Sequence, residues 1–98
     1  MEEYKFYEAR NTMVLTTKGV IKEKQKVLLV VHDEEDGMWQ FLEGFDVEET
    51  NAVIIGLGEM VEIDETLNQV ANLPVGWIAY RNDIKSDWIR KRWDSSLA

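Results

Sequence analysis

The stretch that decides the fold is HDEEDGMWQFLEGFD, residues 32–46, together with the apolar run VLLVV, residues 27–31, that precedes it. The acidic residues after this run end on Gly37, and the aromatic segment Met38–Leu42 then leads away from the turn. A β-branched run, a turn that contains glycine and an alternating aromatic run are typical of a β-hairpin. The sequence therefore predicts two antiparallel strands with a block of carboxylates at their turn.

Further strands are predicted on either side of this hairpin. Thr12–Thr17 is short and rich in β-branched residues, and Ala52–Leu57 is a short apolar run. Trp77–Arg81 places alternate large side chains on opposite faces, which is typical of a strand. Because Val27–His32 is apolar on both faces, we expect this strand at the centre of the sheet.

Two short helices are predicted in the second half of the chain. Asp64 can accept hydrogen bonds from the free N–H groups of a first helical turn, and Pro74 stops the helix that follows. A second helix is expected over Ile84–Trp93, with the basic residues 90–92 in its last turn, where they complement the helix dipole. Lys18–Lys26 is expected to form a turn or one helical turn. Asp46–Asn51 is expected to be a loop, and residues 58–61 a turn.

The expected fold is a single α+β domain over residues 1–98, with a mainly antiparallel sheet of about four or five strands and two short helices. Ninety-eight residues provide enough material for one hydrophobic core and too little for two. Residues 1–11 are expected to form an N-terminal arm, and residues 94–98 a frayed tail. Apolar residues make up 45% of the chain, which indicates a globular core and excludes a disordered acidic segment.

The composition also narrows the class of function. The chain contains no cysteine, which excludes disulfides, thiolate metal sites and cysteine nucleophiles. His32 is the only histidine, and no Gly-x-Ser-x-Gly motif occurs, so we predict no catalytic residue, no metal site, no cofactor and no enzyme activity. The many carboxylates leave acid–base hydrolysis open as a third possibility. No apolar run reaches the roughly 20 residues that span a bilayer, and the acidic first residues are unlike a signal peptide, so we expect a cytoplasmic protein.

The charges are separated along the chain. The net charge is −8, and the segment between Lys26 and Arg81 holds twelve acidic residues and no Lys or Arg. Such a charge distribution repels nucleic acid and attracts basic partners, although an acidic surface also keeps a small protein soluble. The basic run 90–92 is too small against this background to predict nucleic-acid binding. We therefore expect a basic protein partner, no nucleic acid and no membrane, while the oligomeric state stays open.

Three blocks of the chain resemble a known family. They are His32–Leu42, the pair Glu59–Leu67 and Leu73–Arg81, and the segment Thr16–Val20. They resemble a family of small bacterial proteins first described as a domain of unknown function and later grouped with predicted immunity proteins of polymorphic toxin systems. The resemblance implies a protein that neutralises a cognate toxin, and it implies no catalytic residue.

The hypothesis that follows is a protein-binding surface around the acidic turn. Its expected residues are the turn carboxylates, the acidic residues thought to lie beside them, and one aromatic residue expected to be partly exposed: Asp33, Glu34, Glu35, Asp36, Glu43, Asp46, Glu48, Glu49 and Trp93. Carboxylates would speed association with a basic toxin, and aromatic residues would add affinity. The alternative is a small-ligand-binding or regulatory module with a pocket near Trp39 and Trp77.

Overall fold

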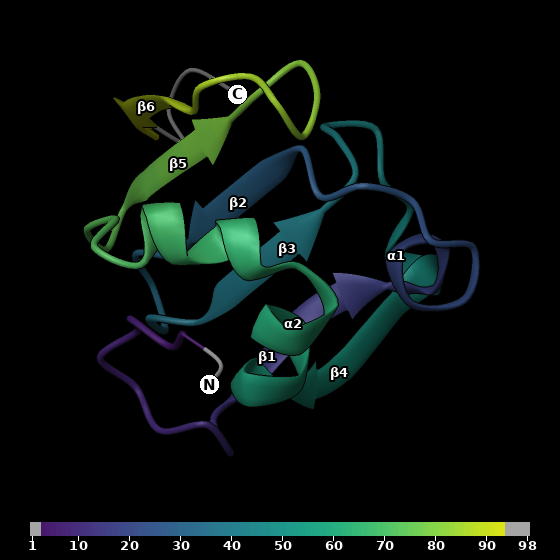
Figure 1. Ribbon diagram of the computed structural model, residues 1–98, viewed down its shortest axis with the longest axis horizontal. Coiled ribbons are helices and arrows are strands. Elements are labelled where there is room, and N and C mark those ends of the chain that lie inside the picture. Colours follow the sequence, from purple (N-terminus) through teal and green to yellow (C-terminus); the bar gives the residue numbers. More distant parts are fainter. Residues whose placement is uncertain (1–2, 94–98) are drawn as a thin grey trace.

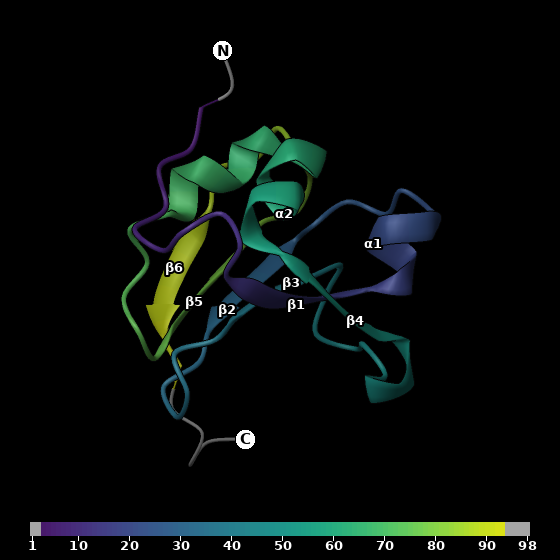
Figure 2. The ribbon, with the colours of Figure 1, turned by 90° about the horizontal axis from the view of Figure 1, so that it is seen from below.

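A computed structural model describes residues 3–93, which form one mixed sheet of six strands with short helices (Figures 1 and 2). The strands are β1 (Met13–Thr17), β2 (Leu29–His32), β3 (Trp39–Leu42), β4 (Ala52–Gly56), β5 (Trp77–Tyr80) and β6 (Ile89–Arg92). Their order in the sheet is β4-β1-β3-β2-β5-β6, and only the β1–β3 pair is parallel. The α+β class is therefore confirmed, but the sheet has six strands and not four or five.

The central hairpin forms as predicted. β2 and β3 are antiparallel with His32 opposite Trp39, and β2 also pairs with β5, which confirms its central place. The N–H of Asp33 donates to the carbonyl oxygen of Met38 over 2.9 Å, and Gly37 closes the turn with φ +72°. Glycine adopts this left-handed conformation without the steric cost that a side chain brings.

Helices cover only one face of the sheet. Helix α2 (Leu57–Ile63) and the 3-10 helix η2 (Glu65–Val70) lie on the same side, whereas α1 (Lys18–Lys22) follows directly from the end of β1 (Figure 2). Between helices and sheet lies the main core, whose buried members include Val14, Val30, Phe41, Leu57, Met60, Leu67 and Val70. This burial is the main term that holds the helices on the sheet.

The opposite face of the sheet carries no helix. Leu29, Leu42 and Ile78 form a small second core there, covered in part by Val47 from the loop after β3. The ring of Phe45 in the same loop meets the Tyr80 ring edge-on, with centroids 5.9 Å apart. Within residues 3–93 no helix packs on the rest of this face, and we refer to it below as the open face.

The predicted helix over Ile84–Trp93 is wrong. Residues 89–92 instead form β6, which pairs with β5 along the edge of the sheet, so the basic residues 90–92 lie on an edge strand. Residues 83–86 form a turn instead of a first helical turn: Asp83 Oδ1 accepts from the N–H of Lys85 over 2.8 Å, and its carbonyl oxygen accepts from the N–H of Ser86 over 3.1 Å. The Trp88 ring lies against the guanidinium of Arg81, 4.0 Å from ring centroid to Cζ. The pairing of residues 89–92 with β5 takes the place of the helix that local propensity favours.

The segment from Leu57 to Val70 is more helical than the sequence predicts. A turn was expected after Gly58, but α2 occupies this segment, and its buried side chains Leu57, Met60 and Val61 have helical spacing. Asp64 is an N-cap as predicted, since its Oδ1 accepts from the N–H of Thr66 over 3.0 Å, although the helix it caps is a 3-10 helix. The expected frayed tail, residues 94–98, lies outside the described residues.

Candidate functional site

The acidic turn forms one wall of a cleft of about 410 Å³ at the end of the central hairpin. The cleft is lined by Val31, His32, Asp33, Glu34, Glu35, Gln40, Gly76 and Trp93. Two backbone hydrogen bonds bring its three segments together: the N–H of Gly76 donates to the carbonyl of His32 over 2.7 Å, and the N–H of Trp93 donates to the carbonyl of Gly76 over 2.8 Å. The last strand thus carries an aromatic side chain to the acidic turn.

Two of the four turn carboxylates have a structural role. Asp33 Oδ1 accepts from the N–H of Glu35, and Asp36 Oδ1 accepts from the N–H of Met38, each over 2.8 Å. Glu34 and Glu35 are exposed, and within residues 3–93 no Lys or Arg forms an ion pair with any of the four. The negative charge of the turn is therefore not neutralised locally, and it is available to a partner.

A rigid aromatic pair supports the cleft from below. The rings of His32 and Trp39 are stacked, with centroids 3.9 Å apart, and the Trp39 Nε1–H donates to Glu8 Oε2 over 2.8 Å. His32 Nδ1 lies 2.8 Å from the carbonyl oxygen of Leu73, which can only accept, so this nitrogen carries the proton. His32 thus fixes the base of the turn through the backbone at Leu73.

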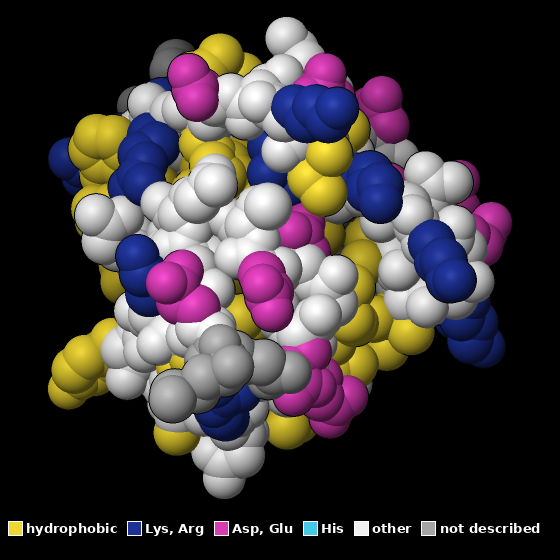
Figure 3. Space-filling model, viewed as in Figure 1, with side chains coloured by type: hydrophobic (Ala, Val, Ile, Leu, Met, Phe, Trp, Pro, Cys, Tyr) yellow, Lys and Arg dark blue, Asp and Glu magenta, His cyan; other side chains and the backbone are white. Residues whose placement is uncertain are grey.

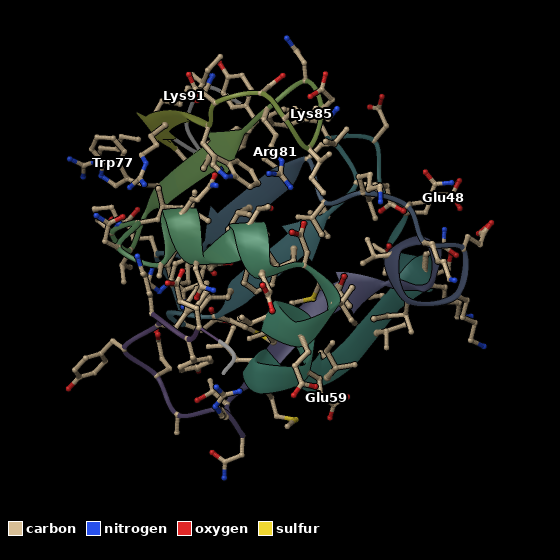
Figure 4. The ribbon with its side chains drawn as sticks, viewed as in Figure 1. Glu48, Glu59, Trp77, Arg81, Lys85 and Lys91 are labelled. Carbon is tan, nitrogen blue, oxygen red and sulfur yellow. The ribbon has the colours of Figure 1, made fainter. Side chains whose placement is uncertain are left out.

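The other predicted acidic residues do not lie beside the turn. β3 separates them from it, because residues 33–36 precede this strand and Glu43 follows it. Glu43 is half-buried and accepts a hydrogen bond of 2.9 Å from Thr17 Oγ1, the N-cap of α1, so its role is structural. Asp46 and Glu48 are exposed around a second hollow of about 360 Å³, and Figure 4 shows Glu48 on the side of α1. Glu49 begins the short 3-10 helix η1 (Glu49–Asn51), and its side chain lies outside the described part of the structure.

The open face connects the two acidic groups. Val31 and Gln40 line the cleft, and both belong to the open face, because they alternate with the core residues Val30 and Phe41. From there the surface continues over half-buried Leu15 to the small core beneath Val47. Half-buried apolar side chains of this face thus lie between two groups of exposed carboxylates, and Lys91 lies over the Tyr80 ring on the same face.

The helix-covered side has a different character. Figure 3 shows Asp and Glu side chains interspersed there with Lys and Arg, without a large area of one sign. Salt bridges on the described chain include the buried pair of Arg81 and Asp64, which lies beneath this side. The separation of signs seen along the sequence therefore does not produce a uniformly acidic surface.

Two of the tryptophans that were singled out in the sequence differ in exposure. Trp93 is 39% exposed, so the expected partial exposure is confirmed, although it follows a strand and not a helix. Trp39 is only 2% exposed and lies between His32 and Phe6, so the ligand pocket expected beside it does not form on this ring. Among residues 3–93 no three His, Asp or Glu side chains are placed to hold a metal ion.

None of the helices in the described part of the chain combines the length and the apolar character needed to cross a bilayer. Comparison of the chain with protein-family models, with curated proteins and with solved structures finds no match in any of the three. No matched protein therefore assigns a function to this chain.

Proposed function

We propose that the protein is a non-enzymatic binding domain that holds a basic protein partner on its open face. The specific form of the proposal is an immunity protein that neutralises a cognate bacterial toxin. The observation that carries the binding role is an apolar sheet face with exposed carboxylates at both ends. The proposal that this partner is a toxin is supported by the resemblance of residues 32–42 and the two other sequence blocks to predicted immunity proteins.

The apolar part of the open face has the composition of an interface core. Met13, Ile54 and Ile89 are each more than half exposed, and the register of the sheet places all three on this face. Met13 and Ile54 lie at one edge of the sheet and Ile89 at the other, with half-buried Leu15, Val31 and Tyr80 between them. Apolar side chains that gather on one sheet face are typical of a contact surface. A partner that covers this face would remove the apolar side chains from water, which is the main source of affinity in protein complexes.

The charged ends of the face favour a basic partner. Glu34 and Glu35 at one end and Asp46 and Glu48 at the other would attract lysine and arginine side chains and align the partner before contact. Trp93 beside the acidic turn can stack with a cationic side chain that enters the cleft. Binding should therefore weaken as the salt concentration rises.

Capture from a lysate of the organism that encodes the chain tests this proposal. The immobilised wild type is compared with a turn variant that carries Asp33→Asn, Glu34→Gln, Glu35→Gln and Asp36→Asn. The Asn oxygens can still accept the two hydrogen bonds that shape the turn. A control variant removes four charges elsewhere, with Glu23→Gln, Glu59→Gln, Glu62→Gln and Asp87→Asn, all exposed.

We expect one basic protein on the wild type and on the control, eluted as salt rises, and much less of it on the turn variant. Equal retention by all three would contradict the role of the acidic turn. If growth of cells that express the captured protein is not restored by co-expression of this chain, the immunity role is wrong even where binding is real.

A further inference from the structure

A further cavity, separate from the cleft and from the hollow beside Asp46 and Glu48, lies at the opposite end of β2 from the acidic turn. Its volume is about 310 Å³, and it is lined by Val20, Ile21, Lys24, Gln25, Lys26, Val27, Ile63, Asp64 and Ile84. Three separate stretches meet there: α1 with the loop before β2, the end of α2, and the loop before β6. Figure 3 shows apolar side chains in the hollow between α2 and α1. This volume is within the range of small-molecule sites.

Five of the nine lining residues are aliphatic, and they extend from the floor of the cavity to its mouth. Val20 and Val27 are almost fully buried, whereas Ile63 and Ile84 remain 51% and 36% exposed. Water at such a mouth contacts aliphatic surface on two sides, so the apolar body of a ligand would gain by displacing it. The walls therefore select a ligand with an apolar body.

A buried ion pair holds the back wall in place. Asp64 Oδ2 lies 3.1 Å from Arg81 Nη2, and the side chains are 8% and 0% exposed. Nε and Nη2 of Arg81 also donate to the carbonyl oxygen of Val27 over 3.1 and 3.0 Å, so Arg81 links two lining residues. Because Arg81 neutralises Asp64, this carboxylate presents little net charge to a ligand.

The rim of the cavity is basic in an otherwise acidic protein. Residues 18–26 contain four lysines and one glutamate, and Lys24 and Lys26 are the two that line the cavity. Lys24 has φ 56°, a left-handed conformation that is rare for residues with a long side chain. Such a conformation persists where the surrounding structure imposes it, and it is common at ligand sites.

We propose that this cavity binds a small amphipathic carboxylate, with its apolar body against Val20, Ile63 and Ile84 and its carboxylate between Lys24 and Lys26. The site is separate from the open face, and it does not depend on the proposed protein partner. It gives the small-ligand alternative a location that the sequence did not indicate, because its lining comes from three separate stretches, 20–27, 63–64 and 84.

Nuclear magnetic resonance titration of the ¹⁵N-labelled protein tests the site. Sodium octanoate is the probe, and octylammonium chloride, with the same alkyl chain and the opposite charge, is its control. Octanoate should shift amide signals of residues 20–27, 63–64 and 84, and it should bind about tenfold more tightly than octylammonium. Equal affinities, shifts confined to the open face, or no shift at millimolar octanoate would each overturn the proposal.

Matched charge variants separate the rim from the general field. Lys24→Gln with Lys26→Gln should weaken octanoate binding about three- to thirtyfold, the effect of removing two exposed charge pairs. Lys18→Gln with Lys22→Gln removes the same charge from exposed positions outside the lining, and it should leave the affinity within twofold. Equal weakening by both pairs would show that no defined carboxylate position exists, and it would overturn the proposal.

Discussion

Replacing Arg81 with methionine should lower the free energy of unfolding by about 3–5 kcal/mol, the cost of breaking a buried ion pair from one side. Arg81 is only 4% exposed and donates five hydrogen bonds, to Val27, Asp64, Thr66 and Ile84. Burial lowers the pKa of Arg81 below its usual value, and the negative charge of Asp64 opposes this shift. Methionine fills similar space but leaves the Asp64 carboxylate buried without its counter-charge.

A second substitution separates the charge from the packing. Asp64→Asn removes the stranded charge and keeps an oxygen that can accept from the N–H of Thr66. The double variant Arg81→Met with Asp64→Asn should therefore be more stable than Arg81→Met alone, by about 1–2 kcal/mol, a coupling typical of residues in direct contact. Lys85→Met is the control, because it removes an exposed cation near the same loop and should change stability by less than about 0.5 kcal/mol.

The assay is equilibrium unfolding in guanidinium chloride followed by tryptophan fluorescence. The same slope of free energy against denaturant in all variants would show that only stability has changed. A loss below about 1 kcal/mol for Arg81→Met would refute the buried ion pair. A double variant as unstable as Arg81→Met would refute the stranded charge as the cause.

Three further predictions concern the backbone and the arm. Lys24→Gly should raise the stability by up to about 1 kcal/mol, because glycine adopts a φ of 56° without strain, and a lower melting temperature would contradict that conformation. Gly37→Ala should lower stability by about 1–2 kcal/mol for the converse reason at φ +72°, and denaturant unfolding measures it. Burial of the Tyr4 side chain, and after it the negative charge of Glu8, raises the pKa of Tyr4 above 10. The folded state therefore holds the phenol proton more tightly than the unfolded state does. This contribution to stability is lost as the pH rises through the raised pKa. Unfolding curves between pH 8 and 11 should therefore show a steeper loss for the wild type than for Tyr4→Phe, and parallel curves would contradict it.

The central hairpin could be predicted because its signals are local. The turn needs a positive φ at Gly37, and the strands on both sides carry β-branched and aromatic residues. Helix α2 was missed because Gly58 favours a turn. In the structure Gly58 serves packing instead: its N–H donates to the carbonyl of Arg10 over 2.9 Å, and a Cβ there would lie 2.9 Å from the Arg10 Cβ. The C-terminal helix was wrongly predicted because the spacing of Ile84 and Trp88 fits a helix, whereas the pairing of residues 89–92 with β5 is a tertiary contact that this spacing does not show.

The candidate site was predicted only where its residues are neighbours in sequence. Residues 33–36 share one turn, so their grouping follows from the hairpin alone. The acidic residues after β3 were wrongly placed beside the turn, because the prediction used only their closeness in sequence. In the structure β3 carries the chain from the turn to the other end of the sheet. The approach of Trp93 to the turn depends on its backbone hydrogen bond to Gly76, which pairs two distant segments.

We propose above that the open face of the sheet binds a basic protein. The most direct test is capture from the same lysate, at low salt, on three immobilised proteins with matching circular dichroism spectra: wild type, Val31→Arg on the open face, and Ile63→Arg on the helix-covered side. Both positions retain exposure, and the long arginine side chain can reach solvent from either. The account predicts the same basic protein on the wild type and on Ile63→Arg, and its loss on Val31→Arg. Retention of that protein by Val31→Arg at the wild-type level, or no basic protein on the wild type, would contradict it.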